Sequence, residues 1–245
     1  MMKELKKQFY LRWNDLALIL LLQTGLFLFG EIVIAVMVHG MNDRESIFPF
    51  GTLLALLVPF ILMLFLGMYS LPVCFNMAIG MGTTRRRMLP AFIGISLLQY
   101  FLGAGMVYLC CLLEKWIFRI AYAGIENELD MQTVFQWKYI VPACIALAAW
   151  NTWMGAVYMK YEKKAFLFFW VLWMTIFIGG FRINRMLEKQ YDHPFLRIYV
   201  KVAEWFREFP ESAVLPAIVL ISAVLIAVSY RILCRQQVQS HSGNR

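Results

Sequence analysis

The chain has 245 residues, of which 61% are hydrophobic and only 16% are charged, and its formal net charge is +8. The apolar residues gather in six stretches of about 20 residues, the length with which a helix crosses about 30 Å of hydrocarbon, and this leaves no room for a soluble domain. Lipid offers no partner to an unpaired backbone group, so spanning segments are helices. We therefore predict an all-α membrane protein, a single transmembrane domain over 1–245 with six transmembrane helices, at about 16–38, 50–71, 89–113, 139–159, 161–181 and 213–233.

The segment before the first span, residues 3–16, carries an apolar face at helical spacing, formed by Leu5, Phe9, Trp13 and Leu16. This pattern predicts an N-terminal interfacial helix, and an ordinary basic flank with an interfacial Trp is an equally open alternative. Within the first span, Glu31 is the one clear ionisable residue. Charged groups inside a membrane are candidates for function, so we weigh a substrate or proton role for Glu31 against a structural role.

Between the second and third spans, residues 73–88 form the most distinctive segment outside the membrane. Pro72 and Pro90 bracket it, and its glycines, Gly80 and Gly82, permit a tight turn. Three adjacent arginines follow this turn, namely Arg85, Arg86 and Arg87. Their simplest interpretation is that they anchor the topology at the inner membrane surface.

Farther along the chain, residues 114–138 are expected to form an outer loop without a binding motif. The fifth span carries an aromatic block that includes Trp170 and Trp173, a pattern that is more typical of packing or lipid contact than of a ligand cage. Residues 195–209 place apolar side chains at helical spacing between Pro194 and Pro210. This spacing predicts an outer amphipathic helix between spans five and six.

The basic residues give the orientation, because cytoplasmic segments retain an excess of Lys and Arg. With both termini inside, 13 cations and three acids face the cytoplasm, whereas ten cations and eleven acids lie outside. The net charge is then explained by topology and by attraction to anionic membrane lipid, so we predict no nucleic-acid partner. We expect a multi-pass protein of the cell membrane with both termini cytoplasmic.

Several kinds of chemistry are not expected of this chain. The motifs G-x-x-x-x-G-K-[ST], H-E-x-x-H and G-x-S-x-G are absent, so the chain has no ATP-binding P-loop, zinc protease helix or nucleophile elbow. Its three histidines are far apart, and none of its five cysteines falls in an outer loop. We therefore predict no catalytic, cofactor-binding or metal-binding residues and no disulfide framework.

The order of these parts resembles that of the membrane subunit (permease) of type-2 ATP-binding-cassette exporters, across the whole chain. The stretch from Phe75 to Leu89 also resembles the small-permease segment of exporters from Gram-positive bacteria, which ends in G-x-[ST]-R-[RK]. The resemblance implies that residues around 73–82 dock on a separate ATPase subunit, which holds ATP and Mg. It implies ATPase-coupling roles for Phe75, Asn76, Met77, Gly80, Gly82, Arg85, Arg86 and Arg87.

The same resemblance implies a second permease chain, identical or similar to this one, and a pathway near Glu31, Trp170 and Trp173. The expected function is export of a peptide, a lipid-like molecule or an amphipathic drug, as in multidrug or peptide efflux. The alternative is a membrane protein that works alone, either a regulatory or assembly factor or an intramembrane enzyme. The sparse charges within the spans argue against a proton-relay transporter.

Overall fold

The computed structural model describes residues 2–40, 46–122, 126–127, 135–188, 201 and 210–235. These ranges form six long α-helices, which are α1 (Met2–Gly40), α2 (Phe50–Gly80), α3 (Arg85–Ala121), α5 (Trp137–Tyr161), α6 (Lys163–Glu188) and α8 (Glu211–Arg235). Two short strands, β1 (Ser46–Ile47) and β2 (Glu126–Asn127), pair in parallel and join the connection after α1 to the one after α3. The chain is therefore a helical bundle, as predicted.

Four of the described helices are long and apolar enough to cross a membrane, namely α1, α3, α5 and α8. This agrees with the predicted membrane protein, while the count of six spans stays a prediction. At about 1.5 Å per residue, the 39 residues of α1 and the 37 residues of α3 extend over more than 50 Å, well beyond about 30 Å of hydrocarbon. Each helix is therefore longer than a membrane crossing needs.

The continuous helices change three expectations. Residues 3–16 are the beginning of α1 and not a separate interfacial helix, because no Pro or Gly interrupts the chain there. Residues 114–121, expected in a loop, continue α3. Residues 73–80 are the last turns of α2, which runs on through Pro72. The expected outer helix at 195–209 lies outside the described residues, apart from Lys201.

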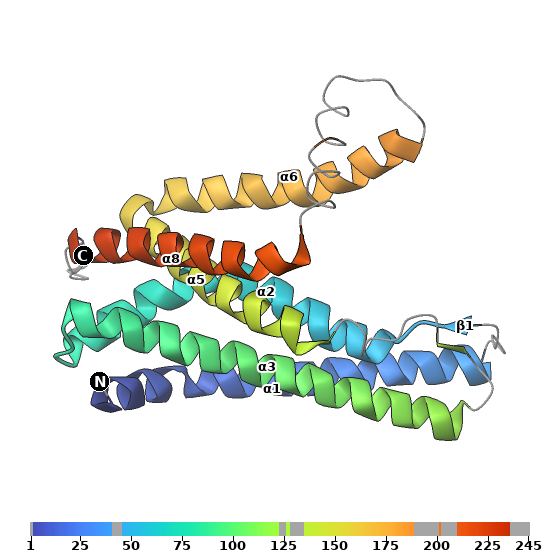
Figure 1. The fold of residues 1–245 in the computed structure, drawn as a ribbon. Coiled ribbons are helices and arrows are strands. Elements are labelled where there is room, and N and C mark those ends of the chain that lie inside the picture. The colour runs from blue at the N-terminus through green and yellow to red at the C-terminus, as the bar shows by residue number, and fades with distance from the viewer. Residues whose placement is uncertain are drawn as a thin grey trace, which may run out of the picture.

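The helices lie nearly along one direction, with α1 and α3 side by side and α6 on the outside of the bundle (Figure 1). Helix α5 is central, since it packs against α2, α3, α6 and α8. The start of α1, the turn between α2 and α3, the junction between α5 and α6, and the end of α8 all lie at one end (Figure 1). We call this the basic end, because it carries a group of lysines and arginines, including Lys3, Lys6, Lys7, Arg85, Arg86, Arg87, Lys160, Lys163, Lys164, Arg231 and Arg235.

Two close approaches at glycines hold α2 in place. A Cβ atom added to Gly30 of α1 would lie 2.5 Å from the Cα of Gly51, and one added to Gly155 of α5 would lie 2.5 Å from the Cβ of Leu71. Only glycine lets the helices approach so closely, as is common among membrane helices. At the basic end the core is a cluster of buried apolar side chains from α2, α3, α5 and α8, including Leu71, Phe75, Met88, Phe92, Ala156 and Leu233.

Candidate functional site at the basic end

The turn between α2 and α3 is built by the two residues that follow the helix, Met81 and Gly82. The amide of Thr83 donates to the carbonyl of Ala78 at 3.0 Å, and the amide of Gly82 donates to that of Ile79 at 2.9 Å. This is the Schellman arrangement, which needs a left-handed residue just past the helix. Gly82 supplies it with φ of +77°, a value that costs glycine little.

The first turns of α1 hold this turn from one side. The hydroxyl of Thr83 donates to Oε2 of Glu4 at 2.6 Å, and Nζ of Lys7 donates to the carbonyl of Met81 at 3.1 Å. Lys7 and Glu4 also pair at 3.7 Å. The bond from Thr83, together with the charge of Lys7, keeps the pKa of the Glu4 carboxyl below its ordinary value. The N-terminus of α1 and the turn therefore form one unit.

An apolar stripe is exposed on the last turns of α2. Val73 and Met77 lie four residues apart on one face of α2, and Met81, the residue just past the helix, follows at the same interval. Their side chains are 50%, 50% and 44% exposed. We call these three residues the α2 stripe. Because α2 has 31 residues, about 46 Å at 1.5 Å per residue, the stripe at its end extends past the hydrocarbon when the start of the helix lies at the opposite membrane surface. Exposed apolar patches in water mark contacts with other proteins.

The structure sorts the residues implied in ATPase coupling into two groups. The exposed ones belong to the α2 stripe, adjoin it or follow it in the chain, and they are Asn76, Met77, Gly80, Gly82, Arg86 and Arg87, with Arg85 partly buried. Phe75, by contrast, is fully buried among the core side chains of the basic end. Its side chain cannot form part of a contact surface, so it positions the exposed residues instead.

The three arginines occupy the first turn of α3, where the helix dipole favours acidic side chains. Three cations there oppose the dipole by about 0.3–1 kcal/mol each at an exposed site. No acidic residue of the described first turn offsets them. Helix stability therefore does not explain these arginines, whereas topology or recognition of an acidic partner does.

Two acidic side chains from different helices meet at the start of α2. Glu114 of α3 is 2% exposed, and its carboxylate accepts hydrogen bonds from the amides of Gly51 at 3.1 Å and Thr52 at 3.3 Å. It thereby pairs two of the free N–H groups at the start of α2 and meets the positive end of that helix. Glu31 of α1 lies beside it, since a Cβ on Gly51 would be 2.7 Å from Oε1 of Glu31 and 3.2 Å from that of Glu114. Glu31 thus belongs to a carboxyl pair.

Sequence reasoning missed Glu114, because we placed it in a loop. A signal was present, since the buried positions of α3 follow one helix face that continues through Glu114, as in Gly103, Val107, Cys110, Glu114 and Phe118. Arg12 was missed as well. Only 7% exposed, it donates to Ser96 Oγ at 2.6 Å and lies 4.8 Å from the centre of the Phe92 ring. It ties α1 to α3 and is not a simple surface cation.

The pathway residues implied by the resemblance do not gather in one place. Trp173 of α6 borders an apolar cavity of about 490 Å³ together with residues of α2, α5 and α8. Trp170 is 46% exposed on the surface of α6. Glu31 contacts the starting turn of α2 instead. The structure therefore separates Glu31 from the fifth-span aromatics.

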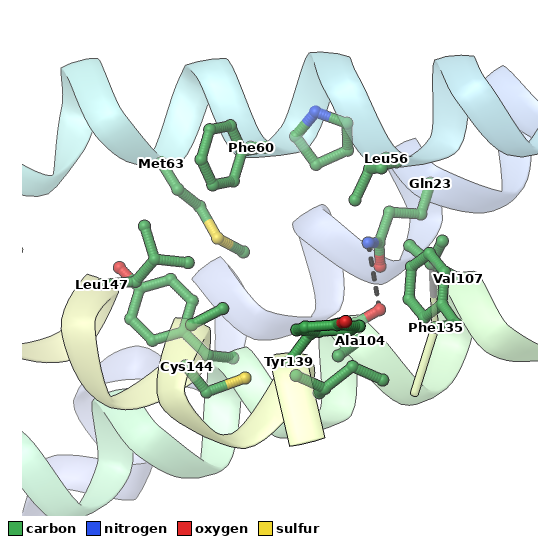
Figure 2. A pocket seen from close by; sticks show the side chains of 15 residues that line it. Gln23, Leu56, Phe60, Met63, Ala104, Val107, Phe135, Tyr139, Cys144 and Leu147 are labelled. Atoms are coloured by element: carbon green, nitrogen blue, oxygen red, sulfur yellow. Dashed lines mark hydrogen bonds between the residues drawn. The ribbon is translucent and has the colours of Figure 1, made fainter. Parts of the chain in front are cut away.

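A second cavity, of about 250 Å³, lies between α1, α2, α3 and the beginning of α5 (Figure 2). Among the described residues, no group of three or more His, Cys, Asp or Glu side chains is arranged to hold a metal ion. No family model matches this chain, and no curated protein or solved structure matches it either.

Proposed function

We propose that this chain is the permease subunit of an ATP-driven exporter in the bacterial cell membrane. In this proposal all six long helices cross the membrane, the basic end faces the cytoplasm, and a second permease chain completes the complex. Energy comes from a separate ATPase subunit that docks at the basic end. The cargo is a peptide, a lipid-like molecule or an amphipathic drug, which moves outward.

The observation that carries the proposal is the α2 stripe next to the arginines of α3. An apolar strip bordered by charge is typical of a protein interface, with an apolar centre and a polar rim. The stripe also has a mechanical connection to the membrane helices. It is the end of α2, whose buried face includes Leu71 and Phe75. A displacement at the stripe is therefore transmitted along α2 toward Gly51, where α1 and α3 meet it.

The proposal is tested by co-purification from native membranes in a mild detergent. We expect the tagged wild-type chain to bring down a P-loop ATPase. The triple variant Val73→Ser, Met77→Ser, Met81→Ser should recover at least about tenfold less ATPase, since a few central side chains dominate the affinity of an interface. Because the three side chains are exposed, the variant should keep the thermal stability of the wild type.

The matched control is Met37→Ser, which changes an exposed methionine near the end of α1 that lies away from the basic end. It should retain the ATPase. If wild-type chain brings down no ATPase, the alternative of a membrane protein that works alone becomes the better one. If the ATPase is recovered equally with the triple variant, an exporter is still supported but docking through the α2 stripe is wrong.

A further inference from the structure

The cavity between α1, α2, α3 and α5 has the size and the lining of a binding site for a small molecule. Its volume is about 250 Å³, and all of its lining side chains are uncharged. An apolar cavity of about 150 Å³ already admits benzene, so this cavity has room for two fused rings. Phe60 and Tyr139, which are 38% and 47% exposed, border it and leave it accessible from the surface of the bundle.

One polar group in this apolar wall lacks a partner. Gln23 of α1 is only 3% exposed, and its Nε2 donates to the carbonyl of Gly103 on α3 at 3.3 Å. Only the NH₂ group can donate to a carbonyl, so this bond fixes which way the amide points. The remaining atom, Oε1, is buried and has no hydrogen-bond donor among the described residues. Figure 2 shows the Gln23 amide near Leu56 and Val107, with its bond to Gly103 dashed.

The rest of the lining selects the shape of a ligand. Aromatic rings come from three helices and from Phe135, which precedes α5, and the thioether of Met63 lies among them (Figure 2). Rings and a polarisable sulfur favour a flat aromatic ligand, through stacked, edge-to-face and sulfur contacts. A charged ligand is disfavoured, because no lining residue could pair with it. What the site lacks is a single hydrogen-bond donor opposite Gln23.

We infer that this cavity binds an uncharged aromatic molecule of about two rings that carries one N–H or O–H donor, and that the donor bonds to Oε1 of Gln23. The inference goes beyond the proposed export function, since binding here needs neither ATP nor an ATPase. The ligand enters from the surrounding lipid, where such molecules partition.

The test compares two probes of nearly equal size, 1-naphthol with one O–H donor and naphthalene with none. The full chain in lipid nanodiscs is dialysed against each radiolabelled probe, with empty nanodiscs giving the background from lipid. We expect saturable binding of one probe per chain, with 1-naphthol bound about three- to tenfold more tightly, the range of one neutral hydrogen bond. Gln23→Leu should abolish this preference and leave naphthalene binding unchanged.

Two further variants keep the result interpretable. Thr24→Val removes the neighbouring hydroxyl, which bonds to Leu20 within α1, and should preserve the preference. Ala104→Leu fills the cavity and should remove saturable binding of both probes. The inference is overturned if the wild type shows no preference, as a water held by Gln23 would produce, if Gln23→Leu retains the preference, or if Ala104→Leu still binds. An ATPase that co-purifies while naphthol fails to bind would overturn this inference alone.

Discussion

The Glu114 carboxylate offers the sharpest test of the packing at the start of α2. Replacing it in Glu114→Ala removes the acceptor of two buried amides, those of Gly51 and Thr52. An unpaired buried backbone donor costs about 1–3 kcal/mol, and the buried position of Thr52 and Glu114 keeps water from replacing the lost acceptor. We therefore expect the variant to lose about 2–4 kcal/mol of unfolding free energy.

The matched control is Glu31→Ala, the same truncation in the neighbouring carboxyl group. Glu31 accepts no bond from the start of α2, so its removal leaves the amides of Gly51 and Thr52 paired with Glu114. We expect Glu31→Ala to lower the unfolding free energy by less than about 1 kcal/mol, or to raise it. The two variants should therefore differ in the sign or size of their change in unfolding free energy, although the substitutions are chemically identical.

The measurement is thermal unfolding in nanodiscs, followed by tryptophan fluorescence. For a chain of this size, 1 kcal/mol corresponds to a shift in Tm of about 2–4 °C, so Glu114→Ala should lower Tm by about 4–16 °C. Equal losses in the two variants would refute the reasoning, as would a Glu114→Ala chain that melts with the wild type. The Tm of Glu114→Gln should fall between those of the wild type and Glu114→Ala, since its amide oxygen still accepts a hydrogen bond but carries no charge to interact with the helix dipole.

Two other pairs of variants test the helix contacts. Gly30→Ala should lower the unfolding free energy by about 1–3 kcal/mol, since its Cβ would overlap Gly51, whereas Gly25→Ala meets nothing within 4 Å and should gain up to about 1 kcal/mol from helix propensity. Equal melting temperatures would show that α1 and α2 do not approach so closely. Gly82→Ala should lower the unfolding free energy by about 1–2 kcal/mol because of the positive φ at this position, whereas Gly80→Ala should not lower it. Urea titration in mild detergent measures both values. A loss of unfolding free energy at Gly80 as large as at Gly82 would contradict the Schellman turn.

Local signals in the sequence were sufficient for the helices and the turn between α2 and α3. Runs of apolar residues predict membrane helices because the backbone groups of a segment in lipid must form their hydrogen bonds within that segment. This requirement does not depend on which other helices lie beside it. Gly82 marked the turn because a left-handed residue is a property of one backbone position. The gathering of cations at one end was also visible, since it depends only on the order of spans and loops.

The tertiary structure alone decided the contacts between helices. Glu114 meets the amide of Gly51 across 63 positions of sequence, and Gln23 meets Gly103 across 80. Hydropathy marks where a helix lies in the chain, but it does not say which faces of two helices meet. The end of α3 was placed too early for the same reason. In the sequence alone Glu114 indicates a loop, but in the structure it is buried because the amides at the start of α2 pair with it. Which side chains of α2 are buried and which form the exposed stripe was likewise set by packing against α3, α5 and α8.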